Sequence, residues 1–292
     1  MAHKSGFINI IGNPNTGKST LMNALVGEKL SIITSKAQTT RHRIMGIVNG
    51  EDFQLVYSDT PGIIRPHYKL HESMMKYIET ALTDADIILY VTQPDEGTYE
   101  PGVIEAINKS GIPVIVIINK IDLSNQPEVE SKIHEMDEYF PGADVIPVSA
   151  LLRFNLNSVF DTILDKLPNA PPYYPKDELT DRSLRFFVSE IIREKILLNY
   201  HQEIPYSAEV VIDQFKEKDY ITVIVASVFV GRDSQKAIII GNKGNAIRKL
   251  GIDARKEIER FLETKVFLEL TVKVRSEWRD DPTQLKRFGY EL

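Results

Sequence analysis

Residues 12–20 read Gly12-Asn13-Pro14-Asn15-Thr16-Gly17-Lys18-Ser19-Thr20, and this stretch decides the fold of the N-terminal part of the chain. It follows an apolar run, Phe7–Ile11, and leads into a helix-like stretch, Lys18–Val26. A strand, a G-x4-G-K-S loop and a helix, in that order, indicate a P-loop, whose glycines let backbone N–H groups turn toward phosphate oxygens. We therefore expect residues 12–20 to bind nucleotide phosphates, with Lys18 as the charged contact and Ser19 as a ligand of Mg²⁺.

A second motif, Asp59-Thr60-Pro61-Gly62, follows the apolar run Phe53–Tyr57. A carboxylate at the end of a strand can reach Mg²⁺, and the N–H of Gly62 can bond a γ-phosphate. Loss of that phosphate would release the loop after Gly62, which is how nucleotide switches work.

A third motif, Asn119-Lys120-Ile121-Asp122, closes the apolar run Val114–Ile118. The Asp122 carboxylate can accept the N1–H and N2–H₂ groups of guanine, a donor pair that adenine lacks. We expect Asn119 to brace the loop and the Lys120 stem to lie along the base. A backbone N–H of Ser149-Ala150 is expected at guanine O6. This motif favours GTP over ATP as the nucleotide.

The stretch Gln38-Thr39-Thr40-Arg41-His42-Arg43 lies between the first two motifs, where a loop should fold over the γ-phosphate. A threonine there can ligate Mg²⁺, and we favour Thr40 over Thr39. The three residues after Thr40 are expected to be exposed in a polar loop. Ile63 stands where many GTPases carry a glutamine that orients the attacking water. Lys18, Thr40 and Gly62 are therefore the expected catalytic contacts, and no general base is assigned.

Short apolar runs alternate with helix-like stretches through the N-terminal half. The strand candidates are Phe7–Ile11, Ile44–Val48, Phe53–Tyr57, Ile87–Thr92, Val114–Ile118 and Asp144–Pro147. The helix candidates are Lys18–Val26, Leu70–Leu82, Val103–Ser110 and Val129–Phe140. This alternation predicts an α/β domain with a mostly parallel sheet covered on both faces. Asn49-Gly50 predicts a hairpin, which adds one antiparallel edge strand.

A proline-rich stretch from Leu167 to Pro175 predicts a semi-rigid connector. We therefore divide the chain into a nucleotide-binding domain at 1–167, a linker at 168–181 and a second domain at 182–292. The second domain shows an α-β-β-α-α-β pattern, which predicts an α+β fold. Its elements are expected at Ser183–Asn199, Ala208–Phe215, Tyr220–Phe229, Ser234–Ile240, Asn245–Leu250 and Val266–Val274.

The turn Gly241-Asn242-Lys243-Gly244 separates the two middle helices of this domain. A GxxG loop between two helices is how KH domains clamp about four nucleotides of single-stranded RNA. Lys243, Arg248 and Lys249 would add positive charge, and Ala237–Ile240 would form the floor of the groove. The single tryptophan, Trp278, would either stack on a base or cap the domain core.

The composition of the 292 residues, with 42% hydrophobic and 26% charged side chains, is that of a globular protein. Zero cysteines exclude disulfides, thiolate metal sites and a cysteine nucleophile. Residues 1–180 carry 15 basic and 23 acidic side chains, a net charge of −8, whereas residues 181–292 carry 20 and 18, a net charge of +2. No signal-peptide pattern and no run of about 20 apolar residues is present, so we expect a cytoplasmic protein. His67 and His71 are not expected to bind a metal.

Taken together, these motifs in this order resemble the Era family of bacterial GTPases, over essentially the whole chain. The resemblance implies a P-loop GTPase domain followed by a type II KH domain, with GTP or GDP and Mg²⁺ as cofactors. It also implies binding to the 3′ region of 16S ribosomal RNA, a role in assembling the small ribosomal subunit, a monomer and peripheral contact with the inner membrane. The C-terminal tail around Trp278 would join in RNA recognition. An alternative is a ribosome-binding scaffold in which the nucleotide is a structural ligand.

Overall fold

The structure is a computed structural model that describes residues 3–97 and 99–291. It divides into two compact units. The first unit comprises Met1–Pro66 and Met74–Asp181, and the second comprises His67–Ser73 and Arg182–Leu292. The second unit thus begins its main segment at residue 182 and also includes a short segment from the middle of the N-terminal half.

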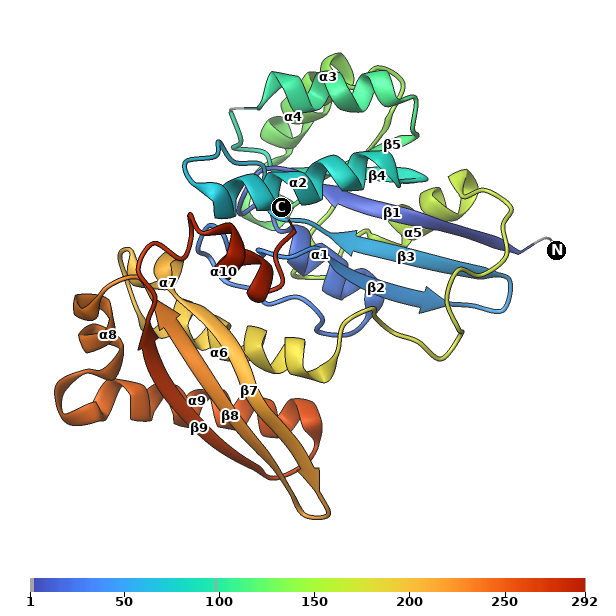
Figure 1. Cartoon of the computed structure of the whole chain (residues 1–292). Coiled ribbons are helices and arrows are strands. Elements are labelled where there is room, and N and C mark those ends of the chain that lie inside the picture. Colours follow the sequence, from blue (N-terminus) through green and yellow to red (C-terminus); the bar gives the residue numbers. More distant parts are fainter. Residues whose placement is uncertain (1–2, 98, 292) are drawn as a thin grey trace. The chain divides into compact units, whose positions relative to one another are not determined.

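The first unit contains a six-stranded sheet in the order β2-β3-β1-β4-β5-β6 (Figure 1). All neighbours are parallel except the edge strand β2, which runs antiparallel to β3. The strands are β1 (Lys4–Ile11), β2 (Ile44–Asn49), β3 (Phe53–Asp59), β4 (Ile87–Thr92), β5 (Val114–Ile118) and β6 (Asp144–Pro147). The helices are α1 (Lys18–Val26), α2 (Lys69–Thr83), α3 (Pro101–Ser110), η1 (Ile121–Leu123), α4 (Gln126–Tyr139) and α5 (Leu156–Lys166).

The sheet forms as the sequence predicts. All residues of β4 and most of β1 and β5 are buried, as expected for strands covered on both faces. At the Asn49-Gly50 turn the Gly50 N–H donates to the Phe53 carbonyl over 2.9 Å, which confirms the predicted hairpin. The parallel strands β1, β3, β5 and β6 end at one edge of the sheet, and the loops that follow them carry the nucleotide motifs.

The stretch 168–181 packs on the first unit beside the edge strand β2 and its neighbour β3. The Gln54 side-chain oxygen accepts hydrogen bonds from the N–H groups of Tyr173 and Tyr174, at 2.7 and 2.9 Å. The Ile47 N–H on β2 donates to the Leu179 carbonyl over 2.8 Å. Because an edge strand exposes unpaired backbone groups, this stretch finds partners there. It is a packed part of the first unit rather than a bare connector.

The second unit has a three-stranded sheet in the order β7-β8-β9, with β7 antiparallel and β9 parallel to β8 (Figure 1). The predicted α-β-β-α-α-β order is confirmed, with short helices α7 and α10 in addition. The elements are α6 (Leu184–Asn199), α7 (Ile204–Ser207), β7 (Glu209–Lys218), β8 (Ile221–Val230), α8 (Asp233–Ile240), η2 (Asn242–Gly244), α9 (Asn245–Leu262), β9 (Val266–Val274) and α10 (Pro282–Arg287).

The core of the second unit lies between one face of this sheet and the helices α6 and α9. Its buried members include Ile192 on α6, Val228 on β8 and Ala254 on α9. Within the described residues, no helix is both long and apolar enough to span a membrane.

Candidate functional site

Lys18 lies buried at the base of a cavity of about 310 Å³, which the P-loop and residues 32–40 line. Its Nζ donates to the carbonyls of Gly12 and Asn13, at 2.9 and 2.7 Å. Burial lowers the pKa of Lys18 to about 8, against the opposing effect of the Asp59 and Glu96 carboxylates. An anion in the cavity would therefore meet a desolvated cation, which is the arrangement that phosphate binding needs.

Three side-chain oxygens meet beside this lysine, and they come from three separate motifs. The Ser19 hydroxyl donates to Asp59 Oδ2 over 2.6 Å and lies 2.8 Å from the Thr40 hydroxyl, which itself lies 3.3 Å from Asp59 Oδ2. Thr39 instead donates to the Lys36 carbonyl over 2.6 Å. The structure thus brings Thr40, and not Thr39, to the expected metal position.

The donor set fits a magnesium ion. Hard carboxylate and hydroxyl oxygens are what Mg²⁺ prefers. Among the described residues, Asp59 Oδ1 is buried without a hydrogen-bond partner, and burial raises the pKa of this carboxyl group. A cation placed there would satisfy the oxygen and favour the ionised carboxylate.

Gly62 approaches the P-loop so closely that no side chain fits. A Cβ at this position would lie 2.7 Å from backbone atoms of Pro14, so only glycine allows the contact. The Thr60 hydroxyl fixes the preceding turn by donating to the Ile10 carbonyl over 2.7 Å. Ile63 is buried in the core of the first unit, so its side chain is not available to the attacking water.

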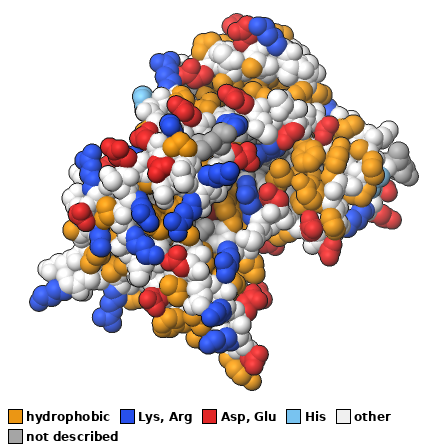
Figure 2. Space-filling model, in the orientation of Figure 1, with side chains coloured by type: hydrophobic (Ala, Val, Ile, Leu, Met, Phe, Trp, Pro, Cys, Tyr) orange, Lys and Arg blue, Asp and Glu red, His pale blue; other side chains and the backbone are white. Residues whose placement is uncertain are grey.

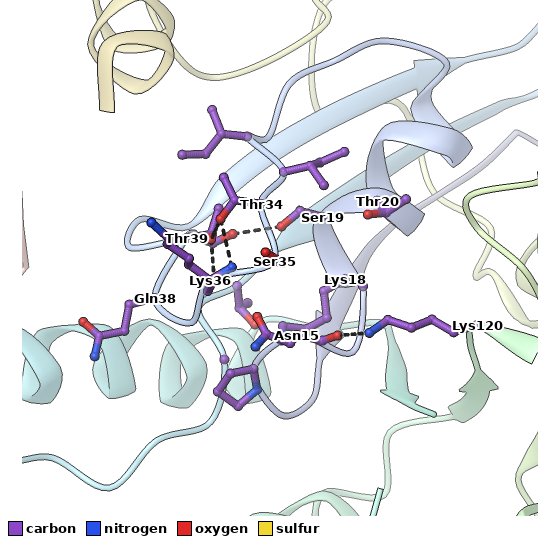
Figure 3. A pocket seen from close by; sticks show the side chains of 17 residues that line it. Asn15, Lys18, Ser19, Thr20, Thr34, Ser35, Lys36, Gln38, Thr39 and Lys120 are labelled. Carbon is purple, nitrogen blue, oxygen red and sulfur yellow. Dashed lines mark hydrogen bonds between the residues drawn. The ribbon is translucent and has the colours of Figure 1, made fainter. Parts of the chain in front are cut away.

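The third motif braces the P-loop as predicted. Asn119 Nδ2 donates to the Thr16 carbonyl over 2.9 Å, and Asn119 Oδ1 accepts from the Ala150 N–H over 3.0 Å. The Lys120 side chain lines the cavity and reaches the Asn15 carbonyl (Figure 3). The Asp122 side chain lies in η1 and is exposed to solvent.

The predicted contact of a backbone N–H with guanine O6 meets an obstacle. The Ala150 N–H is already paired with Asn119, and the Ser149 N–H donates to the Phe154 carbonyl over 3.3 Å. This contact stays a prediction, and it requires one of the two bonds to open.

The expectation for the residues after Thr40 was wrong. Arg41, His42 and Arg43 are all buried, with exposed fractions of 0%, 6% and 5%. A polar pattern in the sequence does not reveal this, because the partners of Arg43 come from three distant parts of the chain.

Glu96, which follows β4, was not among the site residues predicted from the sequence motifs. Its carboxylate accepts a hydrogen bond from the Thr92 hydroxyl over 2.6 Å and one from the Asn13 side chain of the P-loop. Burial raises the pKa of Glu96. No local pattern marks this residue, since the contact exists only once β1 and β4 pair.

The GNKG turn lies in the second unit and joins α8 to α9, as predicted. Gly241 has a φ of 71°, and a Cβ there would lie 2.5 Å from the Ala246 side chain, so the turn needs glycine. Asn242 and Lys243 are exposed. The backbone and the lysine are therefore open to a phosphate.

A groove of about 550 Å³ lies between α9 and β9. Arg248 lines this groove and Lys249 does not. Arg255, about two turns further along α9, also lines it and was not singled out from the sequence. The floor predicted at Ala237–Ile240 stays a prediction: none of these residues lines this groove, Ile239 is buried in the core and Ile238 is 50% exposed. The groove residues are Ile247, Arg248, Gly251, Ile252, Arg255, Leu268, Glu269 and Leu270. Figure 2 shows Lys and Arg side chains gathered among apolar ones over the C-terminal unit.

Trp278 caps the core of the second unit. It is 1% exposed, and its indole N–H donates to the Ser207 carbonyl over 3.0 Å. Its ring contacts that of Phe288, with centroids 5.5 Å apart. Of its two expected roles, the structure shows the packing one, because a ring covered in this way has no face open to a base.

Trp278→Ala should destabilise the second unit by about 3–5 kcal/mol, the usual cost of removing a buried aromatic side chain. Hydrogen exchange of α6 and β8 in the full-length chain would measure this loss. Tyr220→Ala is the matched control, because Tyr220 is 87% exposed. Trp278→Phe should retain RNA affinity to within about twofold. A large loss of RNA affinity without faster exchange would instead favour base stacking.

Comparison with known proteins identifies the family. The family described as 50S ribosome-binding GTPase matches residues 7–120, and the KH domain family matches residues 203–279. The GTPase Era of Geotalea daltonii is 43% identical over 290 residues, which cover 98% of each chain. The chain belongs to the Era family of GTPases. Among residues 3–97 and 99–291, no group of three or more His, Cys, Asp or Glu side chains is placed so that it could hold a metal ion.

Solved structures of Era proteins match the whole fold. One is Era in complex with MgGDPNP and nucleotides 1506–1542 of 16S ribosomal RNA, with a TM-score of 0.94 and 40% identity over 99% of this chain and 100% of that one. Another is a variant of Aquifex aeolicus Era bound to GDP and AlF4⁻, with a TM-score of 0.93 and the same identity and coverage. The Era fold, a P-loop GTPase domain followed by a KH domain, is therefore that of this chain.

Proposed function

We propose that this protein binds and hydrolyses GTP with Mg²⁺ and binds the single-stranded 3′ region of 16S ribosomal RNA, and that it assists assembly of the small ribosomal subunit. The observation that carries the first part is the convergence of Ser19, Thr40 and Asp59 beside a buried Lys18. Membership of the Era family and the GNKG turn beside the α9–β9 groove support the second part.

In hydrolysis, a water oxygen attacks the γ-phosphorus of GTP, the bond to the β–γ bridging oxygen breaks, and GDP and phosphate leave. Lys18 would hold the β- and γ-phosphates in place of its present carbonyl partners, and Gly62 N–H would bond the γ-phosphate. Ser19, Thr40 and Asp59 would hold Mg²⁺, which neutralises charge on the phosphates. Because Ile63 is buried, the side chain after Gly62 supplies no group to orient the water, so we expect slow intrinsic turnover.

In the KH domain, Gly241, Asn242, Lys243 and Gly244 would contact RNA phosphates, and Arg248 and Arg255 would line the path of the bases. We further propose that the protein is a cytoplasmic monomer, with contact to the inner membrane limited to peripheral association. The domain limits 1–167, 168–181 and 182–292 remain part of the proposal.

The decisive experiment is fluorescence anisotropy of an oligonucleotide that matches the 3′ end of 16S rRNA. The protein is loaded with GDP or with a non-hydrolysable GTP analogue, and we expect tighter binding in the GTP-like state. The double variant Asn242→Asp, Lys243→Asp should reduce RNA affinity by at least about tenfold, because carboxylates then face the phosphates. The variant should keep GDP affinity, because the nucleotide motifs lie in the first unit, and hydrogen exchange of α6 and β8 controls for folding of the second unit.

Equal RNA binding in both nucleotide states would contradict a nucleotide-gated switch. It would leave two separate activities on one chain, and the alternative of a scaffold with a structural nucleotide would then account better for the result.

A further inference from the structure

Arg43 makes a dense set of contacts for a residue that ends a loop. Its Nε donates to the Ser58 hydroxyl over 2.6 Å. Its two terminal nitrogens donate to the two carboxylate oxygens of Asp84, at 2.6 and 2.9 Å, and one of them also donates to Asn9 Oδ1 over 3.1 Å. All these residues lie in the first unit. A planar guanidinium that binds a carboxylate through two nitrogens is held in both position and orientation.

The partners of Arg43 place it at a junction of the nucleotide motifs. Ser58 directly precedes Asp59 on β3, and Ile44, the next residue after Arg43, pairs with Asp59 across the sheet. Asn9 lies on β1, the strand that leads into the P-loop, and its Nδ2 donates to Asp84 Oδ1 over 2.7 Å. Asp84 directly follows α2, the helix that comes after the Asp59–Gly62 motif.

His42, the residue before Arg43, also contacts α2 near this junction. The His42 ring lies 6.3 Å from the ring of Tyr77 on α2. The loop is thus fixed at 42–43, while Thr40 lies only three residues earlier in the sequence. Three residues of chain span at most about 10 Å, so an anchored Arg43 keeps Thr40 within reach of Ser19 and Asp59.

We propose that Arg43 is a positioning residue for GTP hydrolysis, which anchors the end of the loop 33–43 to β3 and to the end of α2 so that Thr40 can join Ser19 and Asp59. This inference rests on the proposed GTPase function. Breaking the anchor lets the loop populate states in which Thr40 is away from the site. The apparent affinity for a ligand that needs Thr40 is then reduced in proportion to the fraction of protein molecules that have Thr40 in place.

The test uses Asp84→Asn, because the Asp84 side chain is 39% exposed and the asparagine amide oxygen can still accept a hydrogen bond from Arg43, whereas the second charged contact is lost. The matched control is Asp144→Asn. It breaks the Asp144–Lys166 ion pair, 2.7 Å long, at the start of β6 and away from the nucleotide motifs. Arg43→Lys is a second variant, since lysine keeps the charge but cannot bind both carboxylate oxygens in the plane.

Affinities for GDP and for a GTP analogue are measured with fluorescent nucleotides at several Mg²⁺ concentrations, together with thermal unfolding. For Asp84→Asn and Arg43→Lys we expect about tenfold weaker binding of the GTP analogue, a higher Mg²⁺ requirement in that state only, and unchanged GDP affinity. The kcat for GTP hydrolysis should fall by a factor similar to the loss of affinity for the GTP analogue. Asp144→Asn should match the wild type in all of these.

Equal loss of GDP and GTP-analogue affinity in the Asp84 variant would overturn the proposal, because a purely structural role affects both states. No loss in either state would overturn it as well. Failure of the wild-type protein to bind guanine nucleotides would refute the proposed function itself, and the positioning role with it.

Discussion

Asp122→Asn is expected to lower the affinity for GDP by about 10²–10⁴-fold and to shift the preference toward xanthine nucleotides. The carboxylate would accept two guanine N–H groups, and a hydrogen bond to a charged group contributes about 1.5–3 kcal/mol. An asparagine amide cannot accept from N1–H and N2–H₂ at once, but it can donate to the O2 of xanthine. Competition of GDP and XDP against a fluorescent nucleotide would measure the change.

The control for this substitution is Glu128→Gln, at the start of the neighbouring helix α4, where the side chain is exposed. It should leave both affinities unchanged. RNA affinity should also be unchanged in the Asp122 variant, since the GNKG turn lies in the other unit. If Asp122→Asn keeps the preference for guanine, the assignment of Asp122 to the base is wrong.

Lys18→Ala is expected to reduce kcat for GTP hydrolysis by at least about 10²–10³-fold, the usual cost of removing one preorganised group that stabilises charge in a transition state. Of the three lysines that line the cavity in the described part of the chain, only Lys18 is buried; Lys36 and Lys120 are partly exposed, and Lys120 reaches the Asn15 carbonyl. Release of phosphate under saturating GTP and Mg²⁺ is the measurement.

Lys166→Ala is the matched control for Lys18→Ala, because Lys166 pairs with Asp144 on the surface of the same unit. It should hydrolyse GTP at the wild-type rate. Turnover that survives in Lys18→Ala would mean that the residues around the cavity do not perform the reaction. The scaffold alternative, in which the nucleotide only stabilises the fold, would then be the better account.

The nucleotide site could be predicted to a large extent because its parts are short and local. A P-loop needs glycines and a lysine at fixed spacing, and the strand before it is a continuous apolar run, Phe7–Ile11. The structure extends that strand to Lys4–Ile11 and keeps the helix Lys18–Val26 as predicted. Helix α9 was predicted too short, at Asn245–Leu250 instead of Asn245–Leu262, because Gly251 interrupts the pattern that marks a helix.

The sequence by itself determined which chemical groups are present and in which order the strands and helices follow. Both depend on residue type and on short spacing along the chain. Only the tertiary structure decided the burial of Arg43, the pairing of Glu96 with Asn13 and the packing role of Trp278, and it confirmed Thr40, which the sequence favoured over Thr39. It also decided that Arg255 on α9 and Leu268 on β9 line the same groove. Each of these depends on partners far apart in the sequence, which meet only when the strands pair and the helices pack on them.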